Sequence, residues 1–337
     1  MHRTYLLPEN GTYFKANMHC HTTFSDGRMT PEQVKIEYKK RGYSIVAFTD
    51  HEYLASHNEL TDDAFLALTG YEISVDKTSD DIVEKQKTYH LNFYAKNPNQ
   101  EYHVCFHPKY VWCGDKSKIS NLKYIGELFE RNYSVECVNQ MIAEANKNGF
   151  LVSYNHPAWS GQRGCDYLGL RGLTAAEIYN HSSEGGYNFG YGEEAYASFC
   201  DNGIEVGCFA TDDNHNSLTN DYDSILCDSF GGRTYFKAEK LSYDSIMEAF
   251  EKKNFYASTG VELYDLYMED DTLTVNCSAC CKVFVIAGGR ILYKKLSATD
   301  DITGAQFTIN RKNAKYLRVI CVNTKNQKAY SNAYFHF

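Results

Sequence analysis

The sequence predicts an α/β barrel followed by a small antiparallel β domain. Between about residues 14 and 255, short apolar runs alternate with helical patterns, which is typical of a parallel sheet with crossover helices. This length of alternation suits a barrel. From about residue 264 onward the apolar runs are short, turn-forming residues separate them and no helical pattern stands out, so antiparallel strands are expected. We therefore expect two domains, residues 1–260 and residues 261–337.

The expected strands of the first domain are apolar runs bounded by polar or turn residues. They are YSIVAFTDH, FLALTGYE, YHLNFYA, GFLVSYNH, TAAEIYN and IEVGCFATDD. The expected helices carry start signals: Thr30 is the N-cap of one helix, Pro31 its first residue, and Gln33 completes a capping box. A second helix begins at Ser134 in the same manner, and two more lie in EEAYASFCDNG and SYDSIMEAFEKKN.

The composition excludes several classes of protein. Apolar residues make up 43% of the 337 residues, but no run approaches the roughly 20 residues of a membrane helix, and no signal peptide is evident. The net charge of −9 argues against a stable nucleic-acid complex, which needs a basic surface. The 12 cysteines are scattered in apolar runs, which predicts reduced thiols and a cytoplasmic location. Cys277 and Cys280 form one CxxC, without the second pair that a structural zinc site needs.

Histidines and acids stand at the ends of successive expected strands. His19 and His21 are two residues apart on a strand-like run, so both imidazoles point to the same side. In a β/α barrel the carboxyl ends of the strands share one face, where groups distant in sequence converge. The full set is His19, His21, Asp26, His51, Glu72, His90, His156, Asp213 and His215.

Crowding so many imidazoles and carboxylates into one pocket requires a neutralising partner. Desolvated like charges are costly, and buried imidazoles without partners lose hydrogen bonds. Divalent cations solve both problems, because neutral imidazole and carboxylate are their natural ligands. Nine ligands exceed the need of one ion that keeps a position open for substrate, so the sequence predicts two or three metals.

The motifs HCHTTFSDG, TDH, GYE, the single His90, NHP and DNH resemble, in this order, those of the polymerase and histidinol phosphatase (PHP) family. The resemblance covers about residues 14–260. It implies a distorted (β/α)7 TIM-like barrel of the PHP type and a di- or trinuclear site of manganese, iron or zinc. It also implies hydrolysis of phosphate esters of small molecules or nucleotides. The stretch YASTG at 256–260, followed by β structure, resembles the small-molecule phosphoesterases of the family.

Carried over residue by residue, the resemblance implies three groups of ligands. The first metal would be held by His19, His21, Glu72 and Asp213. Glu72 would bridge to a second metal held by His90 and His156. Asp26, His51 and His215 would hold the third, with Asp26 where many members of the family have histidine.

Several assignments have competitors. Asp212 competes with Asp213, although the D-x-H spacing favours Asp213, and Asp50 is expected to orient a ligand imidazole. His103 and His107 are rivals of His90. The expected catalytic groups are Asp213, His181 as a leaving-group acid or a plain loop histidine, and Arg163 as a phosphate clamp or an exposed loop residue. Trp159 either stacks on a base or sugar, or packs.

The expected function is hydrolysis of a phosphate ester by attack of a hydroxide that two metals share. The partner is a small phosphorylated substrate such as a nucleotide or sugar phosphate, with no membrane involved. One alternative is an amidohydrolase-like C–N hydrolase on the same barrel, although the bridging lysine usual there ends no expected strand. Another is a non-catalytic sensor of a phosphate ligand. The residues leave the substrate, the metal and the oligomeric state open.

Overall fold

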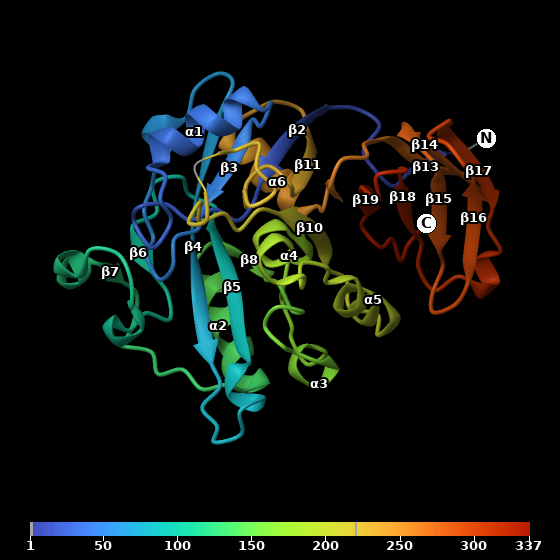
Figure 1. Cartoon of the computed structure of the whole chain (residues 1–337). Helices are drawn as coiled ribbons and strands as arrows, with labels where there is room; N and C mark the ends of the chain where they lie inside the picture. The colour runs from blue at the N-terminus through green and yellow to red at the C-terminus, as the bar shows by residue number, and fades with distance from the viewer. Residues whose placement is uncertain (1–2, 220) are drawn as a thin grey trace.

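The chain builds an α/β structure around one large mixed sheet (Figure 1). This computed structural model describes residues 3–219 and 221–337. The order of strands in the sheet is β10-β9-β8-β5-β4-β3-β2-β11-β12-β19-β18-β15-β16. Its first nine strands are β2 (Thr12–Asn17), β3 (Ile45–Phe48), β4 (Leu66–Asp76), β5 (Thr88–Ala95), β8 (Phe150–Tyr154), β9 (Ala175–Asn180), β10 (Gly207–Thr211), β11 (Arg233–Ala238) and β12 (Phe255–Ser258).

The expectation of a closed parallel barrel is wrong in two respects. First, β5 runs antiparallel to both β4 and β8. Only residues 77–87 connect β4 to β5, and a parallel connection needs a dozen or more residues. Second, no backbone ladder joins β10 to β11 among the described residues, so the sheet is not closed. The Thr234 hydroxyl bridges this gap, accepting from the Ala210 N–H (3.3 Å) and donating to the Ala210 carbonyl (3.1 Å).

The helices are α1 (Pro31–Lys40), α2 (Val135–Lys147), α3 (Gly164–Tyr167), α4 (His181–Tyr187), α5 (Glu193–Asp201) and α6 (Tyr243–Glu251). Four of them lie where the sequence predicts them, two of these beginning at their predicted caps, and two short helices, α3 and α4, were not expected. The capping box of α1 is confirmed: the Gln33 N–H donates to Thr30 Oγ1, and the Thr30 N–H donates to Gln33 Oε1. Ser134 caps α2 in a similar way. Short 3-10 helices are η1 (Asn58–Leu60), η2 (Glu84–Gln86), η3 (Pro108–Tyr110), η4 (Lys116–Asn121) and η5 (Arg311–Asn313).

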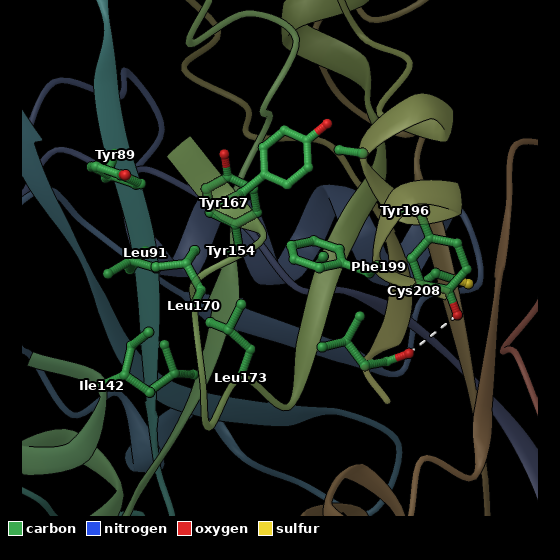
Figure 2. Close-up of a cluster of buried hydrophobic side chains, with 14 of the residues drawn as sticks. Tyr89, Leu91, Ile142, Tyr154, Tyr167, Leu170, Leu173, Tyr196, Phe199 and Cys208 are labelled. Atoms are coloured by element: carbon green, nitrogen blue, oxygen red, sulfur yellow. Dashed lines mark hydrogen bonds between the residues drawn. The ribbon is translucent and has the colours of Figure 1, made fainter. Parts of the chain in front are cut away.

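The helices cover the sheet and enclose the largest apolar core. Figure 2 shows part of it, where Ile142 of α2 lies beside Leu91 of β5 and Phe199 of α5 beside Tyr154 of β8. Tyrosines fill much of this core but keep their hydroxyls paired, as where Tyr196 donates to the Val206 carbonyl at 3.1 Å. Among the described residues, no helix combines the length and apolarity that crossing a bilayer demands.

The C-terminal part is antiparallel β structure, as the sequence predicts. Its strands are β13 (Leu263–Glu269), β14 (Thr272–Cys280), β15 (Lys282–Ile286), β16 (Leu292–Leu296), β17 (Ile302–Thr308), β18 (Arg318–Val322) and β19 (Lys328–Ser331). β13, β14 and β17 form a second sheet with β1 (Arg3–Tyr5), and a separate apolar core fills the space between the two sheets. The large sheet continues from β12 into β19, so this region is joined to the first by backbone pairing. The expected boundary between two domains at residue 260 stays a prediction.

Three cysteine thiols meet inside the C-terminal core. Cys277 and Cys280 lie on β14, and Cys321 lies on β18 in the opposite sheet. The three sulfur atoms lie within 4.8 Å of one another and are buried. The CxxC motif of the sequence contains Cys277 and Cys280 but not Cys321. We call this group the thiol cluster.

Candidate metal centre

The nine predicted ligands gather at one edge of the large sheet. His19 and His21 follow β2, His51 follows β3, and Glu72 lies on β4. His90 lies near the start of β5, and His156 follows the end of β8. Asp213 and His215 follow the end of β10. Because β5 is antiparallel, its first residues lie at the edge where its neighbours end, and His90 pairs with Ser74. We call these eight residues, together with Asp26, the metal centre.

The innermost group consists of His19, His21, Glu72 and Asp213. The Nε2 atoms of the two imidazoles face each other at 3.1 Å. Asp213 Oδ1 lies 2.9 Å from His21 Nε2 and 3.1 Å from His19 Nε2. Glu72 Oε1 lies 3.3 Å from His19 Nε2, and its Oε2 lies 3.4 Å from His21 Nε2. Four donor groups therefore converge on one small volume.

Two further groups share members with the first. Glu72 Oε1 also lies 3.0 Å from His90 Nδ1 and 3.3 Å from His156 Nε2. His51 Nδ1 lies 3.0 Å from Glu72 Oε2. The third group is looser and comprises His21, Asp26, His51 and His215, with 3.5 Å between His215 Nε2 and Asp26 Oδ1. Glu72 stands at the junction, which the resemblance to the PHP family implied.

The donor set fits divalent cations better than it fits hydrogen bonding. Glu72 Oε2 and Asp213 Oδ1 are buried and have no hydrogen-bond partner, although imidazole nitrogens lie about them. Bonds of about 2.1 Å at angles between square and tetrahedral place ligand atoms roughly 3.0–3.4 Å apart. Four of the five separations given above for His19, His21, Glu72 and Asp213 fall in this range, and the fifth, 2.9 Å between His21 Nε2 and Asp213 Oδ1, lies just below it. An ion would satisfy the orphaned oxygens and the facing nitrogens together.

The protonation states of His21, Glu72 and Asp213 suit metal ligands, whereas the neighbouring carboxylates, against burial, raise the pKa of His19 and His51, whose rings must lose a proton when an ion binds. Burial and the two neighbouring imidazoles of His215 and His51 lower the pKa of His21 to about 3, so this ring is neutral. Burial opposes ionisation of Glu72, but the surrounding histidines hold its pKa well below the usual range. The pKa of Asp213 is lowered in the same way, against burial, by His19 and His21. Neutral imidazole and ionised carboxylate are the forms that bind a metal.

Glu177 is a functional residue that the sequence analysis missed. This buried carboxylate on β9 accepts from His19 Nδ1 (2.8 Å), from the Thr211 hydroxyl (2.7 Å) and from the His156 N–H (2.9 Å). It thereby fixes the ring of one ligand and the backbone of another. The signal was a single acid inside the apolar run TAAEIYN. Asn155 was missed as well, and its Nδ2 donates to Glu72 Oε1 at 2.9 Å.

Asp50, which was expected to orient a ligand imidazole, and Asp212, the competitor of Asp213, both hydrogen-bond to other groups instead. Asp50 accepts from the N–H and hydroxyl of Thr22 (2.7 and 2.8 Å) and from the Ser25 hydroxyl (2.7 Å), so it holds the turn that follows His21. Asp212 accepts from the Phe230 and Gly232 N–H groups and from the Tyr38 hydroxyl. Asp213 alone of the Asp212–Asp213 pair faces the metal centre.

The rival histidines also lie elsewhere. His103 is buried, where its Nε2 accepts from the Leu54 N–H and its Nδ1 donates to the Lys123 carbonyl. His107 lies beside the exposed carboxylate of Glu130. Neither residue lines the cavity of the metal centre, so His90 is the histidine of the three that does.

The structure does not bring Arg163 or His181 to the metal centre. Arg163 is exposed, and its guanidinium donates to the neighbouring Gln162 carbonyl. His181 lines a separate cavity of about 400 Å³, where its Nδ1 lies 2.8 Å from the Tyr179 hydroxyl. Their expected roles as phosphate clamp and leaving-group acid find no support in this geometry.

A cavity of about 660 Å³ opens over the metal centre. Exposure differs across its floor: the side chains of His19, His21 and Glu72 are at most 1% exposed, whereas those of His215 and Asp26 are 22% and 29% exposed. The side of His215 and Asp26 is therefore the open side of the metal centre. The described residues that line the cavity include no lysine and no arginine.

Residues 17–108 match the model of the PHP domain family. The match spans 92 of the 337 residues and contains six of the nine residues of the metal centre, from His19 to His90. The resemblance seen in the motifs is confirmed over this segment. No curated protein matches the chain in sequence.

Three solved structures are similar to this one. A two-domain protein from Bacteroides vulgatus, containing a predicted PHP-like metal-dependent phosphoesterase, is 14% identical with a TM-score of 0.45, and 98% of each chain is covered. A predicted metal-dependent phosphoesterase from Bifidobacterium adolescentis is 16% identical with a TM-score of 0.37, covering 64% of this chain and 91% of that one. An amidohydrolase from Chromobacterium violaceum, with bound sulfate and no metal, is 15% identical with a TM-score of 0.41, covering 71% and 96%.

Proposed function

We propose that this protein is a metal-dependent phosphoesterase that hydrolyses a phosphate ester of a small molecule or nucleotide. The observation that carries the proposal is the metal centre itself, with the orphaned oxygens of Glu72 and Asp213 among converging histidine ring nitrogens. The PHP domain match over the segment that supplies most of these residues supports it.

The proposal assigns each group of residues a task. His19, His21, Glu72 and Asp213 would hold one divalent ion, His90 and His156 a second together with Glu72, and Asp26, His51 and His215 a third. Bound there, such ions lower the pKa of a coordinated water and neutralise the charge of a phosphate. The task of Glu177 and Asn155 is to keep the ligands oriented by accepting from His19 and donating to Glu72.

Charge explains why the reaction needs these ions. The protein has a net charge of −9, and the described lining of the cavity offers no cationic side chain other than histidine. A phosphate group would be repelled unless bound cations dominate the local field. All nine residues of the metal centre lie within residues 1–260, so the proposal places catalysis in the first expected domain.

The amidohydrolase alternative is not favoured. A bridging lysine would have to reach the metal centre, and no lysine is among the described residues that line the cavity. The sensor alternative differs from the proposal only in lacking turnover.

The test couples metal analysis of the purified full chain to a screen for released phosphate. The screen covers mononucleotides, bisphosphates, cyclic phosphates and sugar phosphates, each with and without a chelator. We expect two or three equivalents of Mn, Fe or Zn, and phosphate release that the chelator abolishes and added metal restores. Bound metal without turnover of any ester would favour the sensor, and absence of bound metal would contradict the proposal.

A further inference from the structure

The mouth of the metal-centre cavity is lined by exposed aromatic and aliphatic side chains. Trp112, Tyr187, Leu218 and Leu226 all line it, although 52–62% of each is exposed. Large apolar side chains gathered around one opening mark a binding surface rather than scattered surface residues. The chain contains two tryptophans, Trp112 and Trp159, and both line this cavity.

The two indoles come from distant segments and stand next to metal-centre histidines. The Trp112 ring centroid lies 5.1 Å from that of His51. The Trp159 ring lies 5.0 Å from His156 and 5.7 Å from His90. Each indole therefore stands beside ligands of the metal centre, within reach of a group attached to a phosphate bound there.

The segment that carries Trp112 is held firmly in place. It belongs to the long connection between β5 and β8, which includes β6 (Tyr102–His103) and β7 (Lys123–Tyr124) at the left of Figure 1. Arg131 of this connection makes a buried bidentate ion pair with Glu52, the neighbour of His51, at 2.5 and 2.8 Å. The Tyr110 hydroxyl accepts from the Arg131 N–H at 2.8 Å, which ties the residues just before Trp112 to the same anchor.

A close backbone contact fixes the other side of Trp112. Gly114 has a φ of +75°, and a Cβ at this position would lie 2.3 Å from the Phe24 carbonyl oxygen. The connection therefore packs directly on the loop that follows His21. The backbone on both sides of Trp112 is thus anchored, so little backbone freedom is lost when a ligand stacks on its ring, which favours binding.

The charge of the lining restricts the substrate further. Besides the metal centre, the cavity is lined by the carboxylates Asp76 and Asp228, and by no described lysine or arginine. A second phosphate on the substrate would find no cation outside the metal centre and would meet these carboxylates. An uncharged planar ring, in contrast, gains from contact with the indoles.

We propose that the substrate is an ester with a single phosphate group whose alcohol part carries an aromatic ring, and that Trp112 and Trp159 bind this ring. This inference rests on the proposed phosphoesterase function and names the substrate class of that site. The ring could belong to a nucleoside or to a smaller aromatic alcohol, and the test separates these two sources.

The first measurement compares KM within matched pairs of substrates. Benzyl phosphate and cyclohexylmethyl phosphate differ in the aromaticity of the ring but have similar alkyl leaving groups, and adenosine 5′-monophosphate and ribose 5-phosphate differ in the base. We expect the aromatic member of at least one pair to have a KM lower by about 5-fold or more. Preference in the first pair alone indicates a small aromatic alcohol, and preference in the second indicates a nucleoside. Equal KM values within both pairs would overturn the inference.

Variants assign the effect to the indoles. Trp112→Ala and Trp159→Ala should raise KM for the preferred aromatic ester by about 5-fold or more while leaving KM for its non-aromatic partner unchanged. Trp112→Phe and Trp159→Phe should retain most of the preference for the aromatic ester, because phenylalanine also offers a ring for stacking. The matched control is Tyr264→Ala, which removes an exposed ring of the C-terminal region and should change neither value. An equal loss for both esters would indicate a structural role and would count against the inference.

A second phosphate tests the charge of the lining. Adenosine 3′,5′-bisphosphate should have a lower kcat/KM than adenosine 5′-monophosphate. A preference for the bisphosphate would overturn the single-phosphate part of the inference.

Fluorescence gives a readout that needs no turnover. Because the chain has only two tryptophans and both line this cavity, tryptophan emission, excited selectively over that of the 28 tyrosines, reports on this cavity. Adenosine or benzyl alcohol should quench it saturably in the metal-loaded protein, and ribose or cyclohexylmethanol should not. Trp112→Phe and Trp159→Phe show which indole responds. Quenching without phosphate release would refute the proposed function but not the ring site, whereas phosphate release without quenching or substrate preference would refute the ring site alone.

Discussion

The metal centre and the thiol cluster are two gatherings of metal-binding side chains with opposite character. In the metal centre, ionised carboxylates are buried with orphaned oxygens, and outer partners such as Glu177 hold individual ligands in place. In the thiol cluster, the sulfur atoms of Cys277 and Cys280 lie 3.7 Å apart, and the Cys280 thiol donates to the Ile302 carbonyl at 3.4 Å. Hydrogen bonding among the thiols, with burial, raises the pKa of Cys277 and Cys321 and lowers that of Cys280. A charge on Cys280 is therefore held by the two neighbouring thiols and requires no ion.

This difference shows which feature distinguishes a metal centre from a dense core. Closeness of donor atoms is common to both clusters. Of the two clusters, only the metal centre holds buried carboxylate oxygens without a hydrogen-bond partner. The thiol cluster instead completes the apolar core between the two C-terminal sheets. The following predictions test this contrast.

The largest effect is expected at Glu72. Glu72→Gln keeps the shape of the side chain but removes the charge that all three ligand groups approach, so bound metal and the rate of phosphate release should fall, the latter by at least about 1000-fold. Glu59→Gln, which alters an exposed acid, is the matched control. Metal analysis and the phosphate-release assay measure both. A Glu72→Gln protein that keeps its metal and its activity would contradict the contrast between the metal centre and the thiol cluster.

An intermediate effect is expected at Glu177. Glu177→Gln leaves a side chain of the same size but weakens the acceptor that orients His19 and supports the backbone of His156. Metal affinity should fall by about 10- to 100-fold, with activity recovering at high metal concentration. Titration with metal in a competition assay measures the affinity. A loss that added metal fails to rescue would show that Glu177 does more than position its neighbour.

The pH dependence of stability should differ between metal-free and metal-loaded protein. In the metal-free protein, burial opposes protonation of His51, but Glu72 and Asp26 outweigh it and raise its pKa to about 9. This contribution to stability is fully present below about pH 6.5, the unfolded value, and is lost as the pH rises through about 9. A bound metal needs the neutral ring, so the gap in Tm between loaded and metal-free protein should widen by a few degrees over this range. A gap that narrows would contradict the assignment of His51.

The smallest effect is expected in the thiol cluster. Cys321→Ala removes a fully buried sulfur and should lower the free energy of unfolding by about 1 kcal/mol through lost packing. Metal content and phosphate release should stay unchanged, because the cluster lies outside the metal centre and its thiols hydrogen-bond one another. Metal analysis of the variant against the wild type checks this. A drop of one metal equivalent would show that the thiol cluster is a metal site after all.

How far the sequence could be interpreted differs from residue to residue. The capping box at Thr30 and Gln33 depends on neighbours three positions apart, so it was predictable and is observed. His19 and His21 share a face because strand periodicity is local. The antiparallel direction of β5 was missed, because the charged connection of residues 77–87 does not reveal whether it turns back or crosses over. Trp112 lies in a connection that carries no periodic signal.

The sequence by itself determined the chemistry of this protein: which imidazoles and carboxylates stand at strand ends, and that so much desolvated charge calls for cations. The tertiary structure alone decided that Glu177 serves the metal centre and that Asp50 holds a turn of the backbone, whereas the D-x-H spacing already favoured Asp213 over Asp212. It also brought Cys321 to Cys277 and Cys280, and both tryptophans to one cavity. The physical reason is that local spacing fixes the direction of a side chain, whereas the partner that it meets depends on how distant strands and connections pack.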